Sequence, residues 1–272
     1  MRTLLALVFA FCSASLAGAA DAGFDIGHTG WSTLLARHVH WNEAKTASSV
    51  DYAGFSNDRP ALQDYLDALA RVDEATFASW PPADREAFLI NAYNAATIAL
   101  VLTRYPDLDS IKDLGGLFSS PWIKVFVNLL GQRRSLDAIE HDLLRGAADY
   151  ADPRIHFAVN CASVGCPALR PEAYVGTSLR EQLEDQARRF LSDRSRNRFD
   201  TDRGRLLISR IFDWYAQDFD AHAGGVRAFL ADRAAVLGLD AGRAVQLRNG
   251  EMPIVFGEYD WSLNRAVPES RP

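Results

Sequence analysis

The most hydrophobic segment of the chain lies between the proline pair at positions 81–82 and Pro106, and its apolar residues cover every face of a helix. Proline suits the first turn of a helix and cannot continue one, so the pattern predicts a helix that fills this interval. A helix that is apolar all round is buried on all sides. Asn91 and Asn94 occupy positions i and i+3 on it, and buried amides must find hydrogen-bond partners. We expect these two side chains to fix neighbouring loops; the alternative is that they line a site.

A shorter amphipathic helix is predicted to begin at Ser135 and to end near Arg145. Glu140 falls inside the apolar arc of this helix. An isolated buried charge is too costly, so Glu140 must be paired or protonated. Residues 211–219 predict another helix, which places Asp218 on a buried face in the same way. The candidate partners for Glu140 are Arg145, His141, His156 and Arg170.

The rest of the pattern alternates between helices and short strands. Strands are predicted at residues 124–130 and 154–159, in a hairpin over 199–208, and around Val245 and Val255; helices are predicted after a cap at Thr177 and over 225–235. No repeat or linker divides the chain. The predicted fold is therefore α+β: a mostly helical single domain whose buried central helix packs on a small, mainly antiparallel sheet.

The first twenty residues have the pattern of a secretory signal peptide. One positive charge precedes an apolar run over residues 4–11, and small residues follow at 17–20. We expect cleavage after Ala19, which leaves a single globular domain of residues 20–272, located in the periplasm or outside the cell. Cys12 would be removed with the signal. No later segment reaches the roughly 18 consecutive apolar residues of a membrane-spanning helix, so no integral membrane span is expected.

Composition and charge narrow the class of partner. Hydrophobic residues make up 48% and charged residues 24% of the chain, as in ordinary globular proteins. The net charge of −6 argues against a nucleic-acid partner, which would need a basic surface. The arginines at 194–198 alternate with small polar residues and are interpreted as a solvated turn; the alternative is a contact with a phosphate or a lipid headgroup. We expect a small molecule or peptide as partner and no cofactor; the oligomeric state stays open.

The two cysteines expected in the mature protein, Cys161 and Cys166, lie in the short segment 160–167. Cysteines of exported proteins normally oxidise, and Gly165 gives the segment the freedom to close a small ring. A structural disulfide is therefore favoured. The alternatives are a catalytic or redox thiol and metal ligation. A metal site would have to use His38 and His40 with a further histidine, a spacing common by chance, and we expect no bound metal.

The catalytic hypothesis makes Cys161 a nucleophile for thiol-dependent acyl transfer or amide hydrolysis, in a papain-like or transglutaminase-like arrangement. His156 or His141 would act as base, and Glu140 or Asp218 would orient the imidazole. The residues assigned to binding are Asn91, Asn94, Arg145, Asn160 and Arg170, of which Asn160 would help to hold an oxyanion. We predict that most members of one set of polar and reactive side chains converge in a single cleft beside the cysteines: Asn91, Asn94, Glu140, His141, His156, Cys161 and Asp218. Trp122, Trp214 and Trp261 have apolar neighbours and are assigned to the core, although carbohydrate binding by tryptophans stays open.

A string of short motifs gives a further indication. The motifs are VDY at 50–52, FLINAYN at 88–94, IEH at 139–141 with Leu144-Arg145, RIHFA at 154–158 leading into NCASVGCP, IF-x-WY-x-x-DF at 211–219, and YDWSLN at 259–264. Together they resemble the domain-of-unknown-function family numbered 547, in its bacterial exported form, over about residues 30–264. The resemblance implies no settled activity. Some eukaryotic members join this domain to a glutaredoxin-like one, which implies thiol chemistry by association only.

Overall fold

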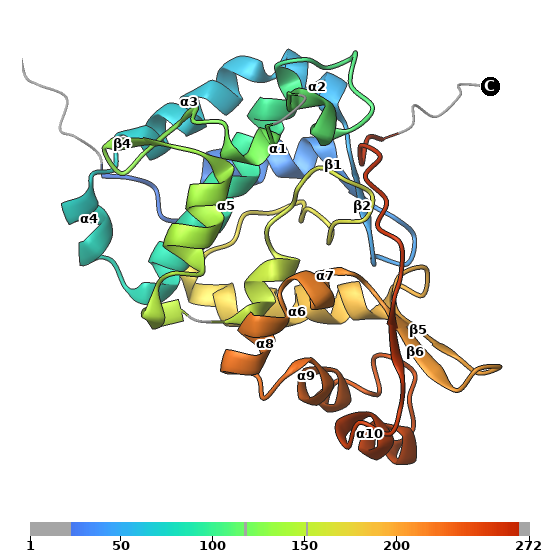
Figure 1. The fold of residues 1–272 in the computed structure, drawn as a ribbon. Helices are drawn as coiled ribbons and strands as arrows, with labels where there is room; N and C mark the ends of the chain where they lie inside the picture. Colours follow the sequence, from blue (N-terminus) through green and yellow to red (C-terminus); the bar gives the residue numbers. More distant parts are fainter. Residues whose placement is uncertain (1–22, 117–118, 151, 267–272) are drawn as a thin grey trace, which may run out of the picture.

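The computed structural model describes residues 23–116, 119–150 and 152–266 (Figure 1). The expected signal peptide, with Cys12, lies outside these ranges. Among the described residues, no helix is both long and apolar enough to cross a membrane.

The N-terminal part is a group of helices around one long central helix. Its elements are α1 (Thr29–His38), β1 (Val39–Trp41), β2 (Ser48–Val50), α2 (Tyr52–Asn57), α3 (Arg59–Ala70), α4 (Glu74–Ser79) and α5 (Pro82–Leu102). The predicted central helix is confirmed as α5, and every residue from Glu86 to Ile98 is buried. Helices α2 and α3 surround it, together with three short segments from the middle of the chain, η3 (Ala138–Leu144), η4 (Ala148–Tyr150) and η6 (Gly176–Ser178). This helix therefore carries its few polar side chains into the interior.

The middle of the chain is built from short helical turns. Its elements are η1 (Ile111–Leu114), η2 (Pro121–Ile123), β3 (Val127–Leu129), β4 (Gln132–Arg134), η3 (Ala138–Leu144), η4 (Ala148–Tyr150), η5 (Pro153–Phe157), η6 (Gly176–Ser178) and α6 (Leu179–Ser192). The predicted strand at 154–159 is wrong, because Pro153 opens a 3₁₀ turn and the Asp152 side chain accepts a hydrogen bond from the Arg154 amide. Thr177 lies in the turn before α6 and does not cap this helix.

The C-terminal part combines a small sheet with four helices. Its elements are β5 (Arg198–Asp200), β6 (Arg205–Ile208), α7 (Ile211–Trp214), α8 (Ala216–His222), α9 (Val226–Asp232), α10 (Ala241–Arg248) and β7 (Ile254–Phe256). The helix predicted over 211–219 breaks at Tyr215, whose backbone leaves the helical region (φ −112°, ψ 20°). The strand predicted around Val245 is wrong, since this residue lies in α10, where Asp240 caps the first turn.

The described strands form three small sheets, and the α+β, mostly helical class is confirmed. β1–β2, β3–β4 and β5–β6 are antiparallel, and β7 joins β6 in parallel. The β3–β4 turn has Leu130 and Gly131 at positive φ, as tight hairpins require. After β7 the chain runs back along the molecule (Figure 1) and makes bridges to Ser163 and Val50.

Two hydrophobic clusters are found among the described residues. The larger one surrounds α5. The smaller one gathers aromatic side chains from η5, α6, α7, α8 and α9, namely Phe157, Phe190, Phe212, Phe219 and Phe229. Tyr93 and Val159 belong to the first cluster and Ile211 to the second, and all three line one cleft. The candidate site therefore takes residues from both clusters.

Candidate functional site

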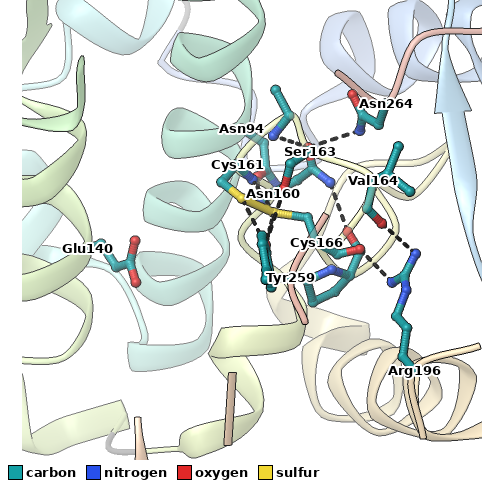
Figure 2. Close-up of a disulfide and its surroundings, with 12 residues drawn as sticks. Asn94, Glu140, Asn160, Cys161, Ser163, Val164, Cys166, Arg196, Tyr259 and Asn264 are labelled. Atoms are coloured by element: carbon teal, nitrogen blue, oxygen red, sulfur yellow. Dashed lines mark hydrogen bonds between the residues drawn. A yellow bond between two sulfur atoms is a disulfide. The ribbon is translucent and has the colours of Figure 1, made fainter. Parts of the chain in front are cut away.

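The cysteine loop (residues 160–167) is closed by a disulfide between Cys161 and Cys166 (Figure 2). Their Cα atoms are 6.1 Å apart, within the range of about 4.4–6.8 Å that a disulfide needs. The favoured prediction for these cysteines is thus confirmed. In this form Cys161 carries no thiol, so it has no nucleophilic sulfur.

Amide side chains hold the cysteine loop from inside. Asn160 donates through Nδ2 to the Pro167 carbonyl (2.8 Å), and its Oδ1 accepts from the Ala162 amide (2.9 Å). Asn94 receives the Asn160 backbone N–H on Oδ1 (2.8 Å) and donates to the Ala158 carbonyl (3.0 Å). With both ends of its buried side-chain amide bonded to backbone groups, Asn160 braces the loop.

Asn91 has the same role one turn earlier on α5. Its amide pairs with both backbone groups of Tyr174, at 2.7 and 3.0 Å. The expectation that Asn91 and Asn94 fix neighbouring loops is confirmed, and neither residue lines the cleft. Arg170, also assigned to binding, lies outside the cleft lining and forms ion pairs with Glu172 and Asp185.

Arg196 holds the cysteine loop from outside. Its Nη1 donates to the Cys166 carbonyl (2.6 Å) and its Nη2 to the Val164 carbonyl (2.7 Å), as Figure 2 shows. The interpretation of this arginine as part of a solvated turn is wrong, because its side chain is only 14% exposed. The carbonyls that accept from Arg196 lie 30 and 32 positions earlier in the sequence. The residues next to Arg196 therefore give no sign of this contact.

Two hydroxyl groups lie against the sulfur atoms. The Tyr259 hydroxyl is 3.2 Å from each sulfur, and the Ser163 hydroxyl donates to it at 3.2 Å. Burial raises the pKa of Tyr259 to about 12, so this group stays protonated and can donate to sulfur. Tyr259 was not among the predicted site residues. The YDWSLN motif was its only signal in the sequence.

A cleft of about 200 Å³ opens beside the disulfide. The described aromatic residues that line it are Tyr93, Trp122, Trp214, Tyr215, Tyr259 and Trp261. Of the predicted site residues, Glu140, His141, His156, Cys161 and Cys166 also line it. Trp214 is 44% exposed, so its assignment to the core is wrong. Of the residues predicted to converge, Glu140, His141, His156 and Cys161 thus line one cleft, whereas Asn91, Asn94 and Asp218 are not among its lining residues.

Glu140 lies on η3, a π-helical segment in which the Arg145 amide donates to the Glu140 carbonyl. Its side chain is buried, and the Tyr215 hydroxyl donates to Oε1 at 2.6 Å. In Figure 2 the carboxylate points toward the disulfide and Tyr259. The predicted partners were the wrong residue types, because the break between α7 and α8 brings a tyrosine to this carboxylate. Burial, together with the Glu140 charge, raises the pKa of Tyr215, so its hydroxyl remains a donor.

Behind Tyr215 lies an ionic group formed by Arg145, Asp218 and His156. Arg145 binds both carboxylate oxygens of Asp218 (2.7 and 2.9 Å), and His156 Nε2 donates to Oδ2 (2.7 Å). Burial alone would raise the pKa of Asp218, but the bonds from His156 and Arg145 outweigh it and hold this pKa well below its usual range. Burial lowers the pKa of His156 against the opposing effect of Asp218. The group is therefore an ionised carboxylate between a guanidinium and a neutral imidazole.

The His156 imidazole is covered. Its side chain is 0% exposed, and its ring stacks on the Tyr215 ring with centroids 3.6 Å apart. Nδ1 is buried and has no hydrogen-bond partner among the residues that the structure describes. His156 thus packs against the ring of Tyr215 and does not present a base to the cleft. His141 is the more accessible histidine: its side chain is 36% exposed and lies 3.4 Å from Asp137.

The described residues include no group of three or more His, Cys, Asp or Glu side chains placed to hold a metal ion. His38, considered for metal ligation, bonds to Asp58 at 2.8 Å, and His40 is exposed on β1.

Comparison with known proteins gives one match. The model of a family described as "Protein of unknown function, DUF547" matches residues 77–191. No curated protein and no solved structure matches the chain. The matched segment contains Glu140, His156 and the cysteine loop, whereas Tyr215 and Tyr259 lie beyond it. Family resemblance is therefore shown for one part of the cleft, and the description of that family names no activity.

Proposed function

We propose that the chain is a non-catalytic binding domain, a single exported domain of residues 20–272 in which the resemblance to DUF547 extends over about residues 30–264. Its ligand is a small molecule or a short peptide that enters the cleft beside the cysteine loop. The Cys161–Cys166 disulfide is structural and forms one side of this cleft.

The observation that carries the proposal is the composition of the cleft. Aromatic side chains on several separate elements surround a single buried carboxylate, Glu140. Ligand sites are typically concave, mostly apolar, and supplied with a few fixed polar groups. Glu140 is fixed by Tyr215, which in turn rests on His156. These contacts keep the Glu140 carboxylate, a hydrogen-bond acceptor, in place inside an aromatic cleft.

Two observations favour binding over catalysis. The Cys161 sulfur is bonded to Cys166, and the imidazole of His156 is fully covered. A nucleophile needs a thiolate and a base within hydrogen-bond reach of it. In the oxidised form the thiolate is absent and His156 is covered, so the one accessible histidine of the lining, His141, has no thiolate to activate.

Export is supported by two independent features. The first is the signal-peptide pattern of residues 1–19. The second is the disulfide, because such bonds persist in oxidising compartments and are rare in the cytosol.

The test is a binding screen on the oxidised, ¹⁵N-labelled protein. The probes are four sets of small compounds: organic cations, carboxylates, monosaccharides and dipeptides. We expect at least one set to shift backbone amides around Glu140, the cysteine loop and Trp214, with no turnover of the compound. The variant Trp214→Ala should abolish those shifts, and Val245→Ala, an exposed apolar position on α10, should not. Shifts confined to other surfaces, or none with any set, would refute the proposal.

A second candidate is thiol-dependent acyl transfer by the reduced protein. It is favoured by one observation: Cys161 and the accessible histidine, His141, line the same cleft. Incubation of the reduced protein with an activated ester separates the two functions. Acylation of Cys161 that disappears in both Cys161→Ser and His141→Ala would support the enzyme, whereas equal labelling of parent and His141→Ala would mean an ordinary exposed thiol.

A further inference from the structure

Glu140 forms no ion pair with any described residue, and the nearby Arg145 is already paired with Asp218. No nitrogen of Lys, Arg or His in the described part of the chain lies within 4.0 Å of its carboxylate, and its hydrogen bond comes from the neutral Tyr215 hydroxyl. Asp218, close by, is paired with both Arg145 and His156. A buried carboxylate without a counter-charge is costly unless something else supplies that charge. The two acids therefore differ: one is neutralised internally and the other faces the cleft.

The walls around Glu140 are suited to a positive charge. Trp214, Tyr259 and Trp261 form one cluster, with ring centroids 4.5–5.8 Å apart, and Trp122 lies 5.7 Å from Trp261. The faces of aromatic rings carry partial negative charge and attract ammonium groups. The chain already uses this property, since the ammonium of Lys112 lies 3.9 Å from the centre of the Trp261 ring.

The other charged group in the lining has the same sign as Glu140. Asp137 is the second carboxylate, and the described lining residues include no lysine or arginine. An anionic ligand would face two carboxylates, and a neutral sugar would leave the Glu140 charge uncompensated. The volume of about 200 Å³ limits the ligand to a small group, since an apolar cavity of about 150 Å³ already holds benzene.

We infer that the cleft binds a small organic cation, an alkylated ammonium group whose charge lies against Glu140 and whose methyl or methylene groups contact the tryptophans. This inference rests on the proposed binding function and specifies its ligand class. Glu140 supplies the countercharge, and the aromatic walls exclude water from the pair.

The experiment compares choline with its uncharged carbon isostere 3,3-dimethylbutan-1-ol (here dimethylbutanol). Each compound is titrated into the oxidised protein, and its binding is followed by tryptophan fluorescence. We expect the isostere to bind at least about tenfold more weakly, as cation–π and charge-pair energies imply. Glu140→Gln should remove this preference while circular dichroism stays unchanged. The matched control is Asp213→Asn, which neutralises an exposed carboxylate on α7 outside the cleft lining and should leave the preference intact.

A second variant covers the case in which Glu140→Gln does not fold. Trp214 is 44% exposed, so Trp214→Ala should fold, and we expect it to lose choline binding. If dimethylbutanol or a sugar binds in the cleft as tightly as choline, the cation assignment is wrong and the binding function stands. If no probe of any class binds in the cleft, both are wrong.

Discussion

The two sides of the cleft are held by different forces. The cysteine loop is closed by a covalent bond and braced by uncharged Asn160 and by Arg196, which bonds to backbone carbonyls. The opposite side, which we call the carboxylate side, consists of Glu140, Tyr215, His156, Asp218 and Arg145. It is held by hydrogen bonds and ion pairs between side chains that meet from η3, η5 and α7–α8. One side should therefore respond to reductant and the other to pH.

The two sides also differ in how directly their residues act on the lining of the cleft. Asp218, Arg145 and His156 fix Tyr215, and Tyr215 fixes Glu140, so several polar side chains place one acceptor. On the cysteine loop the sulfur atoms contact the Tyr259 hydroxyl directly. Substitutions on the carboxylate side should thus affect both stability and binding, whereas loss of the disulfide should mainly loosen the loop.

The largest effect is expected for Asp218→Ala. This change leaves the Arg145 guanidinium and the His156 imidazole without their partner. We expect a loss of about 2–4 kcal/mol in the free energy of unfolding, below the roughly 3–5 of fully buried pairs because Asp218 is 20% exposed. Urea denaturation measures it. Asp213→Ala, which breaks the exposed Arg210–Asp213 pair, is the control and should cost less than about 1 kcal/mol. Equal losses in the two variants would mean that the Arg145–Asp218–His156 group contributes no more to the free energy of unfolding than an exposed ion pair does.

Removal of the disulfide should cost less. Closing a ring between residues five positions apart restricts the unfolded chain by about 2 kcal/mol. We expect Cys161→Ser/Cys166→Ser to lose about that amount, and reduction of the parent protein to have the same effect. A variant that does not fold at all would show that the loop is more than a local tie.

The smallest expected effect is the difference between the two sides in their response to pH. His156 has a lowered pKa, so its contribution to stability is lost as the pH falls below the ordinary histidine value of about 6.5. Asp218 also has a lowered pKa, and its contribution, present above about pH 3.9, is lost on further acidification. Asp218→Asn should therefore reduce the loss of stability that occurs below about pH 3.9 by on the order of 1–2 kcal/mol.

The double cysteine variant provides the contrast in the same measurement. Its unfolding free energy, followed from neutral to acid pH, should run parallel to that of the parent protein, because neither bonded cysteine titrates. A changed dependence of the unfolding free energy on pH in the cysteine variant, or an unchanged one in Asp218→Asn, would contradict the division between the two sides.

Local patterns in the sequence predicted one part of this arrangement well. The apolar run that forms α5 and the position of Glu140 in a buried arc both follow from helical periodicity, and both were correct. The disulfide was predicted from the short spacing of the cysteines and from the expectation of export. Each of these features depends on residues close together in the chain.

The features that failed depend on distant residues or on short segments. Tyr215 reaches Glu140 only because the helix breaks between α7 and α8. Tyr259, which contacts the Cys161 sulfur, lies 98 positions after it in the sequence. Residues 154–159 form too short an apolar run for periodicity to distinguish a strand from a turn of helix, and a proline with its cap decided the outcome. Covered His156 could not be told from an exposed base, because burial of a single side chain is set by the tertiary fold.

The state of the cysteines tests the central claim most directly. The protein, isolated without added reductant from the compartment in which it accumulates, is denatured, treated with iodoacetamide, digested and analysed by mass spectrometry. We predict that Cys161 and Cys166 are recovered unlabelled, within one disulfide-bonded segment, in the great majority of molecules. Recovery of most molecules with both cysteines alkylated would show that the thiols are free in the native protein. It would contradict a structural disulfide beside the cleft.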